Sequence, residues 1–527
     1  MDTKALRQKI LDLAIRGKLV PQDPNDEPAE VLLERIREQK QQMLKEGKLK
    51  KKDIKNDTII FKGEDNLHYE KFQDGTVKCI EDEIPFEIPE GWEWTRLGNL
   101  FSTITGNTPS TKDASLYGDE YPFYKPTDLD AGFDVCFSED TVSEKGYKNG
   151  RILPVYSVLV TCIGATIGKT GYIRNSGICN QQINAILPNT FILPEYTYFC
   201  MCSEFEQQQI WTNSSATTLP ILNKSKFDSL FFPIPPKAQQ TRTVERIKEL
   251  LHFVEIIQQE KRTLQETIKL TKSKILDLAI HGKLVPQDPN DEPASVLLER
   301  IRAEKEELIR QGKIKRDKKE SVIFKGDDNS YYERVGDIIS NIDDEIPFEL
   351  PQNWEWSRLQ TICYPITDGT HKTPTYSDSG YIFLSAKNIT TGKINWNDIM
   401  YIPKSLHDEL YSRVSPKMND ILLAKNGTTG VAAIVDRECE FDIYVTLALL
   451  RVVNNNISSQ YLLKIIASDT IQDYFKSSLK GIGVPNLHLE HIRTTLIPIP
   501  PINEQNKIAE RIYQYYSLLD SIVQNIE

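Results

Sequence analysis

The sequence contains no apolar run long enough to span a bilayer, and its first residues hold no signal-peptide core. That first segment, MDTKALRQKILDLAIRGK, is amphipathic and charged throughout. A hydrophobic content of 39%, a charged content of 26% and a mean hydropathy of -0.42 are typical of a globular protein. We therefore expect no membrane association and a cytoplasmic location.

Cysteine motifs are also missing. The eight cysteines form no C-x-x-C pair, and none has a histidine at zinc-ligand spacing. Only Cys200 and Cys202 lie close together, and free cysteines in a reducing compartment are usually small buried hydrophobes. The sequence therefore predicts no metal or redox site.

Catalytic signatures are absent too. We find no G-x-S-x-G, no H-E-x-x-H, no methyltransferase-like glycine loop with an Asn-Pro-Pro-aromatic motif, and no helicase motor signature. GATIGKTG at Gly164–Gly171 does not have the phosphate-loop spacing, and the equivalent NGTTG at Asn426–Gly430 has no Gly-Lys pair. A β-turn is expected in both places, and no catalytic residue is assigned. A cryptic nuclease or methyltransferase centre remains the enzymatic alternative.

Positive charge is in deficit. The net charge is -11, with a pI of about 5.4, and this argues against nucleic-acid binding because phosphate contacts need Lys and Arg. Clustered bases can still create a positive surface on an acidic protein. Basic runs occur at Lys45–Lys55 and Lys313–Lys319. Each is either a solvated helix end or a contact for phosphate or a partner.

What the sequence does contain is an internal repeat. At 527 residues the chain is too long for one ordinary domain. Three blocks recur in the same order: Lys9–Arg37 as Lys274–Arg302, Asp82–Leu97 as Asp344–Leu359, and Phe232–Ile247 as Ile497–Ile512. The chain is therefore two tandem copies of a unit of roughly 265 residues.

Between these blocks lie two segments, Gly98–Leu230 and Gln360–Thr494, whose sequences differ greatly while sharing a skeleton of strand-like runs. Short β-branched runs bounded by glycine occur at Ser157–Ile163 and Asp420–Asn426. Helical patterns are scarce except near Glu195–Trp211 and Ser459–Leu479. Each insert is predicted to be a mostly-β, α+β domain of about 130 to 150 residues. A common frame with two different inserts suits one kind of task done with two specificities.

The frame itself is helical. Apolar residues from Gln239 to Ile280 follow a near-heptad that predicts a helix about 60 Å long, and Ile508–Ile526 repeats its first half. The matching second half stands at the other end of the chain, as Leu6, Ile10 and Leu13. If the last and first helices abut, they rebuild a second long helix. We then expect an antiparallel coiled coil in a pseudo-two-fold circular arrangement, with the inserts at opposite ends. The alternative is two unrelated amphipathic helices, each packed on its own domain.

Smaller features complete this picture. The Pro- and Asp-rich segment LVPQDPNDEPA should lead to a helix over Ala29–Lys45, with Asn25 or Asp26 as N-cap. The tryptophans are interpreted as anchors of the core or frame rather than as stacking platforms; they are Trp92, Trp94, Trp354 and Trp356.

These motifs together resemble the specificity subunit of type I restriction-modification systems. The resemblance covers essentially the whole chain, and the motifs that carry it are LDLAIRGKLVPQDPNDEPA and its second copy, PEGWEW and PQNWEW, DGTHKTPTYSDSGYIFLSAKNI, NDILLAKNGTTG, and IPIPP-x-x-EQ at Ile497–Gln505. The first insert departs from the second, and it ends in KAQQ (Lys237–Gln240) where the second has INEQ.

The resemblance implies a non-catalytic subunit that binds double-stranded DNA. Each insert would be a target recognition domain that reads one half of a split, asymmetric site, while the helices act as a ruler and dock two modification (methyltransferase) subunits. S-adenosylmethionine would bind those subunits, and ATP and Mg would serve separate restriction (translocase and nuclease) subunits. This chain would hold no cofactor. An interaction scaffold whose inserts bind proteins is the rival function, favoured by the acidic charge.

On this reading the domains are a conserved N-terminal helical region (1–55), target recognition domain 1 (56–236), a central helical region (237–318), target recognition domain 2 (319–501) and a C-terminal helix (502–527). Base readout needs Arg or Lys for guanine and Asn or Gln for adenine, on loops that can enter a groove. The candidates in the first insert are Thr108, Ser110, Lys112, Lys125, Thr127, Lys169, Asn180, Gln181, Gln182 and Lys224. Those in the second are Thr370, His371, Lys372, Thr373, Lys387, Asn388, Lys425, Asn426, Thr428 and Asn486.

Overall fold

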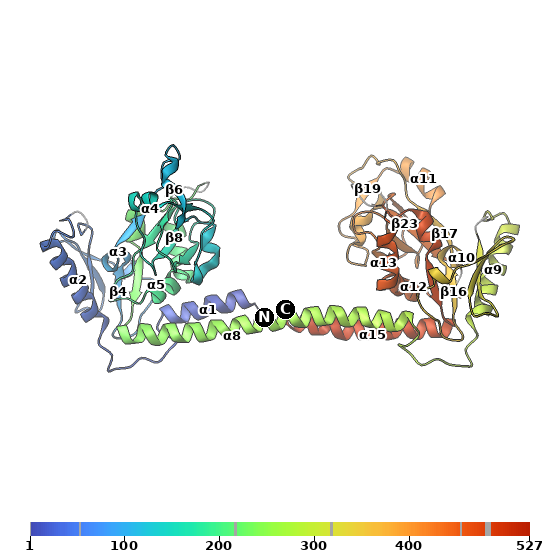
Figure 1. Ribbon diagram of the computed structural model, residues 1–527, viewed down its shortest axis with the longest axis horizontal. Helices are drawn as coiled ribbons and strands as arrows, with labels where there is room; N and C mark the ends of the chain where they lie inside the picture. The colour runs from blue at the N-terminus through green and yellow to red at the C-terminus, as the bar shows by residue number, and fades with distance from the viewer. Residues whose placement is uncertain are drawn as a thin grey trace. The chain divides into compact units, whose positions relative to one another are not determined.

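The computed structural model describes residues 2–51, 54–215, 219–316, 320–453, 456–479 and 486–526. Its contacts divide the chain into two compact units, Met1–Lys261 and Arg262–Glu527. The division falls inside one long helix, α8 (Lys237–Ile280) (Figure 1). Unit 1 thus contains the first part of α8, and unit 2 contains the rest.

Unit 1 combines helices with small β-sheets. The helices are α1 (Thr3–Ile15), α2 (Ala29–Lys45), α3 (Leu97–Leu100), α4 (Glu144–Asn149), α5 (Pro194–Met201), α6 (Glu204–Asn213) and α7 (Lys224–Asp228). The strands are β1 (Ile59–Lys62), β2 (His68–Lys71), β3 (Val77–Cys79), β4 (Glu93–Arg96), β5 (Thr103–Thr105), β6 (Tyr117–Tyr124), β7 (Thr141–Val142), β8 (Val158–Thr161), β9 (Thr170–Tyr172), β10 (Ile178–Cys179), β11 (Ile183–Ile186) and β12 (Phe231–Ile234).

Unit 2 repeats this order of elements. Its helices are α9 (Ala294–Arg310), α10 (Leu359–Ile362), α11 (Lys404–Arg413), α12 (Ser459–Ile466), α13 (Asp469–Ser477), α14 (Leu489–Thr494) and α15 (Ile502–Ile526). Its strands are β13 (Ser321–Lys325), β14 (Tyr331–Val335), β15 (Ile338–Asn341), β16 (Glu355–Arg358), β17 (Cys363–Asp368), β18 (Tyr381–Leu384), β19 (Met400–Ile402), β20 (Ile421–Ala424), β21 (Ala432–Ile434), β22 (Phe441–Ile443), β23 (Leu447–Val452) and β24 (Leu496–Ile499).

The sheets have the same topology in both units. Unit 1 has a four-stranded sheet of order β5-β11-β8-β9, a three-stranded sheet β10-β6-β7, an outer sheet β1-β2-β3, and the pair β12-β4. Unit 2 has the corresponding sheets β17-β23-β20-β21, β19-β18-β22, β13-β14-β15 and β16-β24. The α+β class predicted from the sequence is confirmed, and two inserts of very different sequence adopt one fold.

The four-stranded sheet forms the centre of each insert, because it is covered on both faces. All of β8 and all of β20 are buried. One face of the first sheet packs through Val158 and Val160 on the core shared with the helices, and the other face packs through Leu159 on Tyr124 and Leu129. Burial on both faces explains why these strands are continuous apolar runs rather than alternating ones.

Each unit pairs its part of α8 with a second helix (Figure 1). In unit 1, α1 lies along α8, with Arg7 and Glu255 3.6 Å apart. In unit 2, the Tyr516 hydroxyl of α15 donates to the carbonyl of Lys272, 3.0 Å away. The long central helix, the first helix and the last helix are therefore confirmed as helices. The circular arrangement that would join their ends stays a prediction.

The buried stripe of these helices differs from the expected one. Leu11 and Leu276 enter the core, whereas the expected Leu13 and its equivalent Leu278 are only half-buried. The reason in unit 1 is that α1 packs on α5 and α6 as well as on α8, which turns its apolar face toward the insert.

The expected N-cap of α2 is wrong. Pro28 occupies the cap position and no side chain caps the helix. The first amide of the helix, at Ala29, donates to the carbonyl of Gly91 at 2.9 Å, and the amide of Val31 donates to the carbonyl of Pro28 at 3.2 Å, so backbone carbonyls take the place of a side-chain cap. Asp26 is then free to form an ion pair with Arg242 of α8.

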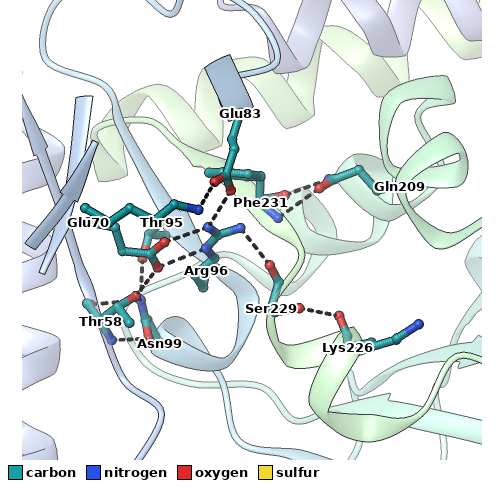
Figure 2. Close-up of polar contacts among 11 residues, drawn as sticks. Thr58, Glu70, Glu83, Thr95, Arg96, Asn99, Gln209, Lys226, Ser229 and Phe231 are labelled. Carbon is teal, nitrogen blue, oxygen red and sulfur yellow. Dashed lines mark hydrogen bonds and ion pairs between the residues drawn. The ribbon is translucent and has the colours of Figure 1, made fainter. Parts of the chain in front are cut away.

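The tryptophan anchors are confirmed, since all four side chains are buried. An arginine completes the frame of each unit. Figure 2 shows Arg96 of β4 between Glu70 of β2 and the corner before β12. Its guanidinium donates to both carboxylate oxygens of Glu70, at 2.7 and 3.0 Å, and to the carbonyl of Ser229 at 3.0 Å. Arg358 repeats this arrangement in unit 2 with Glu333 and the carbonyl of Thr494. These arginines tie the outer sheet to the root of the insert.

Candidate nucleic-acid interface

Loops from separate parts of each insert meet at one edge of the four-stranded sheet. Neighbouring strands in this sheet are antiparallel. The carboxyl ends of β5 and β8 therefore lie beside the amino ends of β11 and β9. The same holds for β17, β20, β23 and β21 in unit 2. We call this the loop edge: residues 106–112, 162–169 and 180–182 in unit 1, and 369–373, 425–430 and 444–446 in unit 2.

A glycine allows the first loop of the edge to lie against the end of a strand of the three-stranded sheet, β10 in unit 1 and β22 in unit 2. A Cβ at Gly106 would be 2.1 Å from the carbonyl oxygen of Asn180, and one at Gly369 would be 1.8 Å from that of Ile443. Only glycine permits such an approach without a shift of the backbone. The next amide is bonded to the same strand in each unit, from Asn107 to Cys179 at 2.9 Å and from Thr370 to Ile443 at 3.1 Å.

Four polar candidates of the first insert, from two of its loops, meet at this edge. The Thr108 hydroxyl donates to Oε1 of Gln181 at 2.5 Å, and both residues are exposed. Asn180 is 7% exposed, and its amide donates to Oε1 of Gln182 at 2.9 Å. Asn180 therefore fixes the turn that presents Gln181 and Gln182.

The cations of the first insert are mostly neutralised by nearby carboxylates. Lys169 lies 2.6 Å from Asp130, Lys224 lies 2.5 Å from Asp228 within α7, and Lys125 pairs with Asp140. The remaining candidates of this insert are exposed; they are Ser110, Lys112 and Thr127. Because each of these pairs has no net charge, the paired lysines add little positive charge to the surface of the insert.

The second insert has a buried ion pair at the base of its edge. The Lys425 ammonium lies 2.5 Å from Oδ2 of Asp368, and both side chains are at most 10% exposed. His371 approaches the other carboxylate oxygen, with Nε2 3.4 Å from Oδ1, while its ring is 69% exposed. The buried Lys425 thus holds Asp368, and the second oxygen of Asp368 faces the outward-pointing histidine.

Other candidates of the second insert lie beside this group. Asn426 and Asn486 form an antiparallel β-bridge, and the Thr373 hydroxyl lies 3.3 Å from that of Tyr444. The exposed candidates are Lys372, Lys387 and Thr428. Asn388 is 7% exposed, and its amide bonds to the backbone of Ser385 and Asp398. Its role in the structure is to hold the turn that carries Lys387.

The two loop edges carry different side chains at equivalent positions of the four-stranded sheet. Thr105 and Cys162 of unit 1 stand where unit 2 has Asp368 and Lys425, since the first of each pair ends its strand and the second directly follows the neighbouring one. The Thr105 hydroxyl donates to Oδ1 of Asn184 at 2.6 Å. Unit 1 therefore has an uncharged hydrogen bond at the position where unit 2 has an ion pair. The same scaffold therefore supports two chemically different edges.

Two arginines at the edge were not identified from the sequence. Arg151 donates to the carbonyl of Thr105, and Arg413 donates to the carbonyl of Gly369 at 3.0 Å. Each follows or ends the short helix of its insert, α4 or α11. Each also begins an Arg-(Ile/Val)-x-Pro segment, RILP at 151–154 and RVSP at 413–416, and this was the sequence signal that could have found them.

The glycine-rich segments at the edge are turns, as expected. Gly164, Gly168, Gly427 and Gly430 all have positive φ.

Within the described ranges no group of three or more His, Cys, Asp or Glu side chains could hold a metal ion. Cys200 is buried beside Glu206, and burial raises the pKa of the Cys200 thiol well above its usual value. Of the helices in the described part of the chain, none has the length and apolar character needed to cross a membrane.

Comparisons with known proteins agree with the duplicated fold. The model of the type I restriction modification DNA specificity domain matches residues 89–266 and again residues 351–527. The specificity subunit of the type I restriction enzyme EcoAI from Escherichia coli is 27% identical, covering 97% of this chain and 88% of that protein. The corresponding subunit of EcoEI, also from Escherichia coli, is 26% identical, covering 99% and 91%.

A solved structure shares the fold. It comes from work on complex assembly and conformational transition of the type I R-M system, with a TM-score of 0.58 at 16% identity, and the match covers 84% of this chain and 94% of that one. The two matches to the domain model cover most of the chain, one in each unit. The chain belongs to the type I restriction-modification DNA specificity family.

Proposed function

We propose that the protein is the DNA-recognition subunit of a type I restriction-modification complex, in which each loop edge reads one half of a bipartite, asymmetric target. One observation carries this proposal: two units with the same strands and the same loop edge present different side chains there. Thr108 and Gln181 stand at the first edge, and His371 and Lys372 at the second. Side chains of these kinds distinguish base pairs in the major groove.

Sequence-specific methylation tests the proposal. We expect a host that contains this chain with its modification subunits to methylate one split sequence, and to lose that methylation without the chain. Thr108→Ala with Gln181→Ala should relax only one half of the target, and His371→Ala with Lys372→Ala only the other. Methylome sequencing measures both results. Relaxation of both halves by either pair would contradict the assignment of one half to each unit.

Two modification subunits are the proposed partners, together with restriction subunits. Each unit exposes a matched pair of apolar side chains on its long helix, Phe253 and Ile257 in unit 1 and Leu518 and Ile522 in unit 2. Exposed apolar residues at equivalent positions support one docking surface per unit. A protein scaffold without DNA specificity is the rival; a gel shift of the assembled complex that selects one split sequence would exclude it.

Methyl transfer and cleavage are proposed to belong to the partners. S-adenosylmethionine, ATP and Mg would then bind those subunits and none of them this chain. The support is that the loop edges contain turns, amides and ion pairs, and that the lysine of the second edge is held by Asp368. Binding of labelled S-adenosylmethionine to the isolated chain would contradict this division of roles.

A further inference from the structure

An arginine holds the start of the first edge loop in each unit. Arg151 donates to the carbonyl of Thr105, the last residue of β5. Arg413 donates through Nη2 to the carbonyls of Asp368 and Gly369, at 3.4 and 3.0 Å. Asp368 is the last residue of β17. The two arginines therefore bind the backbone at the same point of the fold.

The backbone at this point is held from two sides. On one side it is pressed against the neighbouring strand, through Gly106 in unit 1 and Gly369 in unit 2. On the other side lies the guanidinium. In unit 1 a second bond closes the arrangement, because the amide of Arg151 donates to Oδ1 of Asn107 at 3.2 Å. The loop that follows begins from a fixed backbone.

The arginines reach this point from different local structures. Arg151 lies just beyond α4, a helix of 6 residues, whereas Arg413 is the last residue of α11, a helix of 10 residues. Each arginine begins the same short pattern, with Ile or Val next and Pro in the fourth position, in RILP at 151–154 and RVSP at 413–416. The helices before them differ in length and sequence, so the contact recurs on two different supports.

A pair of stacked rings fixes each helix that supplies the arginine. Tyr147 of α4 stacks on Tyr121 of β6 at a centroid distance of 4.1 Å, with 9° between the planes. His407 of α11 stacks on Tyr381 of β18 at 3.7 Å and 6°.

The helix ring of each unit is also bonded to a residue in or just before the adjacent strand, β10 or β22. The Tyr147 hydroxyl lies 2.6 Å from that of Ser176, ahead of β10. Nδ1 of His407 lies 2.7 Å from Oδ2 of Asp442 in β22. These are the strands against which the edge loops rest, so helix, strand and loop form one connected group.

We infer that Arg151 and Arg413 are positioning residues for target recognition. Each sets the backbone from which the first edge loop presents its side chains, Thr108 in unit 1 and His371 in unit 2, and the stacked rings keep the arginine in place. A recognition side chain is effective only when its supporting backbone is held within a fraction of an ångström. This inference rests on the proposed function for its consequence, but its structural part does not.

Hydrogen exchange tests the structural part without DNA. We compare the complex with its modification subunits carrying wild-type chain, Arg413→Ala or Arg413→Lys. The amides of Thr370 and Val445 bond across the start of the second loop. Their exchange should rise about 10-fold in Arg413→Ala, the loss expected when a charged hydrogen bond is removed. Arg151→Ala should affect the first loop alone.

Base discrimination tests the consequence. Arg413→Ala should lower the preference for the methylated target over single-base variants about 10-fold in one half-target, with the other half and the affinity for unrelated DNA unchanged. Arg151→Ala should lower discrimination in the other half-target and leave the first unchanged. Arg300→Ala is the matched control, because it removes the same charge. Arg300 of α9 pairs with Glu292 at the surface, where both side chains are nearly half exposed. It should change neither measurement.

Three results would overturn the inference. The first is unchanged exchange and unchanged discrimination in Arg413→Ala. The second is an equal loss of affinity for target and unrelated DNA, which would make Arg413 a phosphate contact. The third concerns the stacked ring: His407→Ala should speed exchange, and His407→Tyr, which keeps a ring like that of Tyr147, should not. Equally fast exchange in both variants would show that the ring does not hold the arginine. If the wild-type complex selects no split target, the proposed function fails, and the exchange results still decide whether the arginines hold the loops.

Discussion

Single residues at equivalent positions of the two units carry different chemistry. Trp92 of unit 1 donates its indole N–H to the neutral amide oxygen of Gln239, 3.1 Å away. Trp354 of unit 2 donates to the carboxylate of Glu504, 3.0 Å away. Glu504 is 2% exposed, and burial raises the pKa of its carboxyl to about 6. Unit 2 therefore has an ionisable group where unit 1 has an amide.

The first prediction concerns this glutamate. Because the folded-state pKa is raised above the usual 4.5, the folded form favours the protonated acid. Stability is then fullest below about pH 4.5 and falls as the pH rises through about 6, by about 2 kcal/mol. Glu504→Gln should remove that loss. We expect its melting temperature to exceed the wild-type value at pH 8 and to match it at pH 4.5.

Scanning calorimetry at the two pH values measures the difference. The reverse change in unit 1, Gln239→Glu, should lower the melting temperature at pH 8 and have little effect at pH 4.5. A gain from Glu504→Gln that is equal at both pH values would show that its origin is packing and not ionisation.

The second prediction concerns the arginine at the root of the first insert. Burial pushes the pKa of Glu70 upward, but the hydrogen bonds from Arg96 and Thr58 outweigh it and leave the pKa lowered. Arg96→Ala would leave this 4% exposed carboxylate without its cation. We expect a loss of about 3–5 kcal/mol in the free energy of unfolding of unit 1.

Denaturant unfolding measures this loss. The control is Arg35→Ala, which also removes a two-bonded contact with a glutamate, Glu27, but on a surface where both side chains are half exposed. It should cost less than about 1 kcal/mol. Similar losses in the two variants would mean that burial of Glu70 contributes little.

At the scale of elements, the sequence predicts the helices well and the loops partly. Apolar periodicity is a local signal, so α8, α1 and α15 could be read from it. Which leucines are buried could not, because that depends on α5 and α6, which pack on α1 from a distant part of the chain. The cap of α2 failed for the same reason: its acceptor is the carbonyl of Gly91, supplied by another loop.

The candidate interface shows the same limit. Polar residues beside turns singled out Thr108, Gln181 and His371, and the structure places each at the loop edge of its own unit. Sequence reasoning could not separate outward side chains from those that hold the turns, such as Asn180 and Asn388, since both kinds are amides in polar loops. The arginines that bind backbone carbonyls were missed because their shared Arg-(Ile/Val)-x-Pro pattern does not show that the side chain faces a carbonyl.

The third prediction is made for the first edge loop as an element. Gly369→Ala places a Cβ 1.8 Å from the carbonyl oxygen of Ile443, so the loop must move away from β22. We expect Gly369→Ala to abolish the selection of bases in one half of the methylated target, while the other half is still selected. Gly106→Ala should affect the other half instead, and methylome sequencing of each strain measures both results.

Gly312→Ala is a suitable control for these glycines. It has a positive φ of 68° at the end of α9, and a Cβ there meets nothing within 4 Å. It should cost about 1 kcal/mol of stability and leave target choice unchanged. If Gly312→Ala alters methylation as Gly369→Ala does, the effect is global destabilisation and not displacement of the loop.

At the scale of the whole molecule, the long helix connects two complete recognition units. Within α8, every residue from Glu255 to Thr267 is exposed or half-exposed, whereas Val254 and Ile268 are buried in their units. Residues added inside this exposed stretch therefore leave the core of each unit intact. The helix can be lengthened there as a test of the proposed ruler.

The fourth prediction is that the length of the helices sets the gap in the target. Four residues inserted after Lys261, with four more added at the end of α15, lengthen both helices by about 6 Å and turn them about 40° past a full turn. If the helices act as the proposed ruler, the methylated sequence should gain one or two base pairs between its halves, since one base pair is about 3.4 Å long. Methylome sequencing measures that gap. Two inserted residues are the control, because they add about 3 Å but rotate one unit by about 200° and should abolish methylation. An unchanged gap after the four-residue insertion, with methylation retained, would mean that the spacing of the halves is set elsewhere than in the helices.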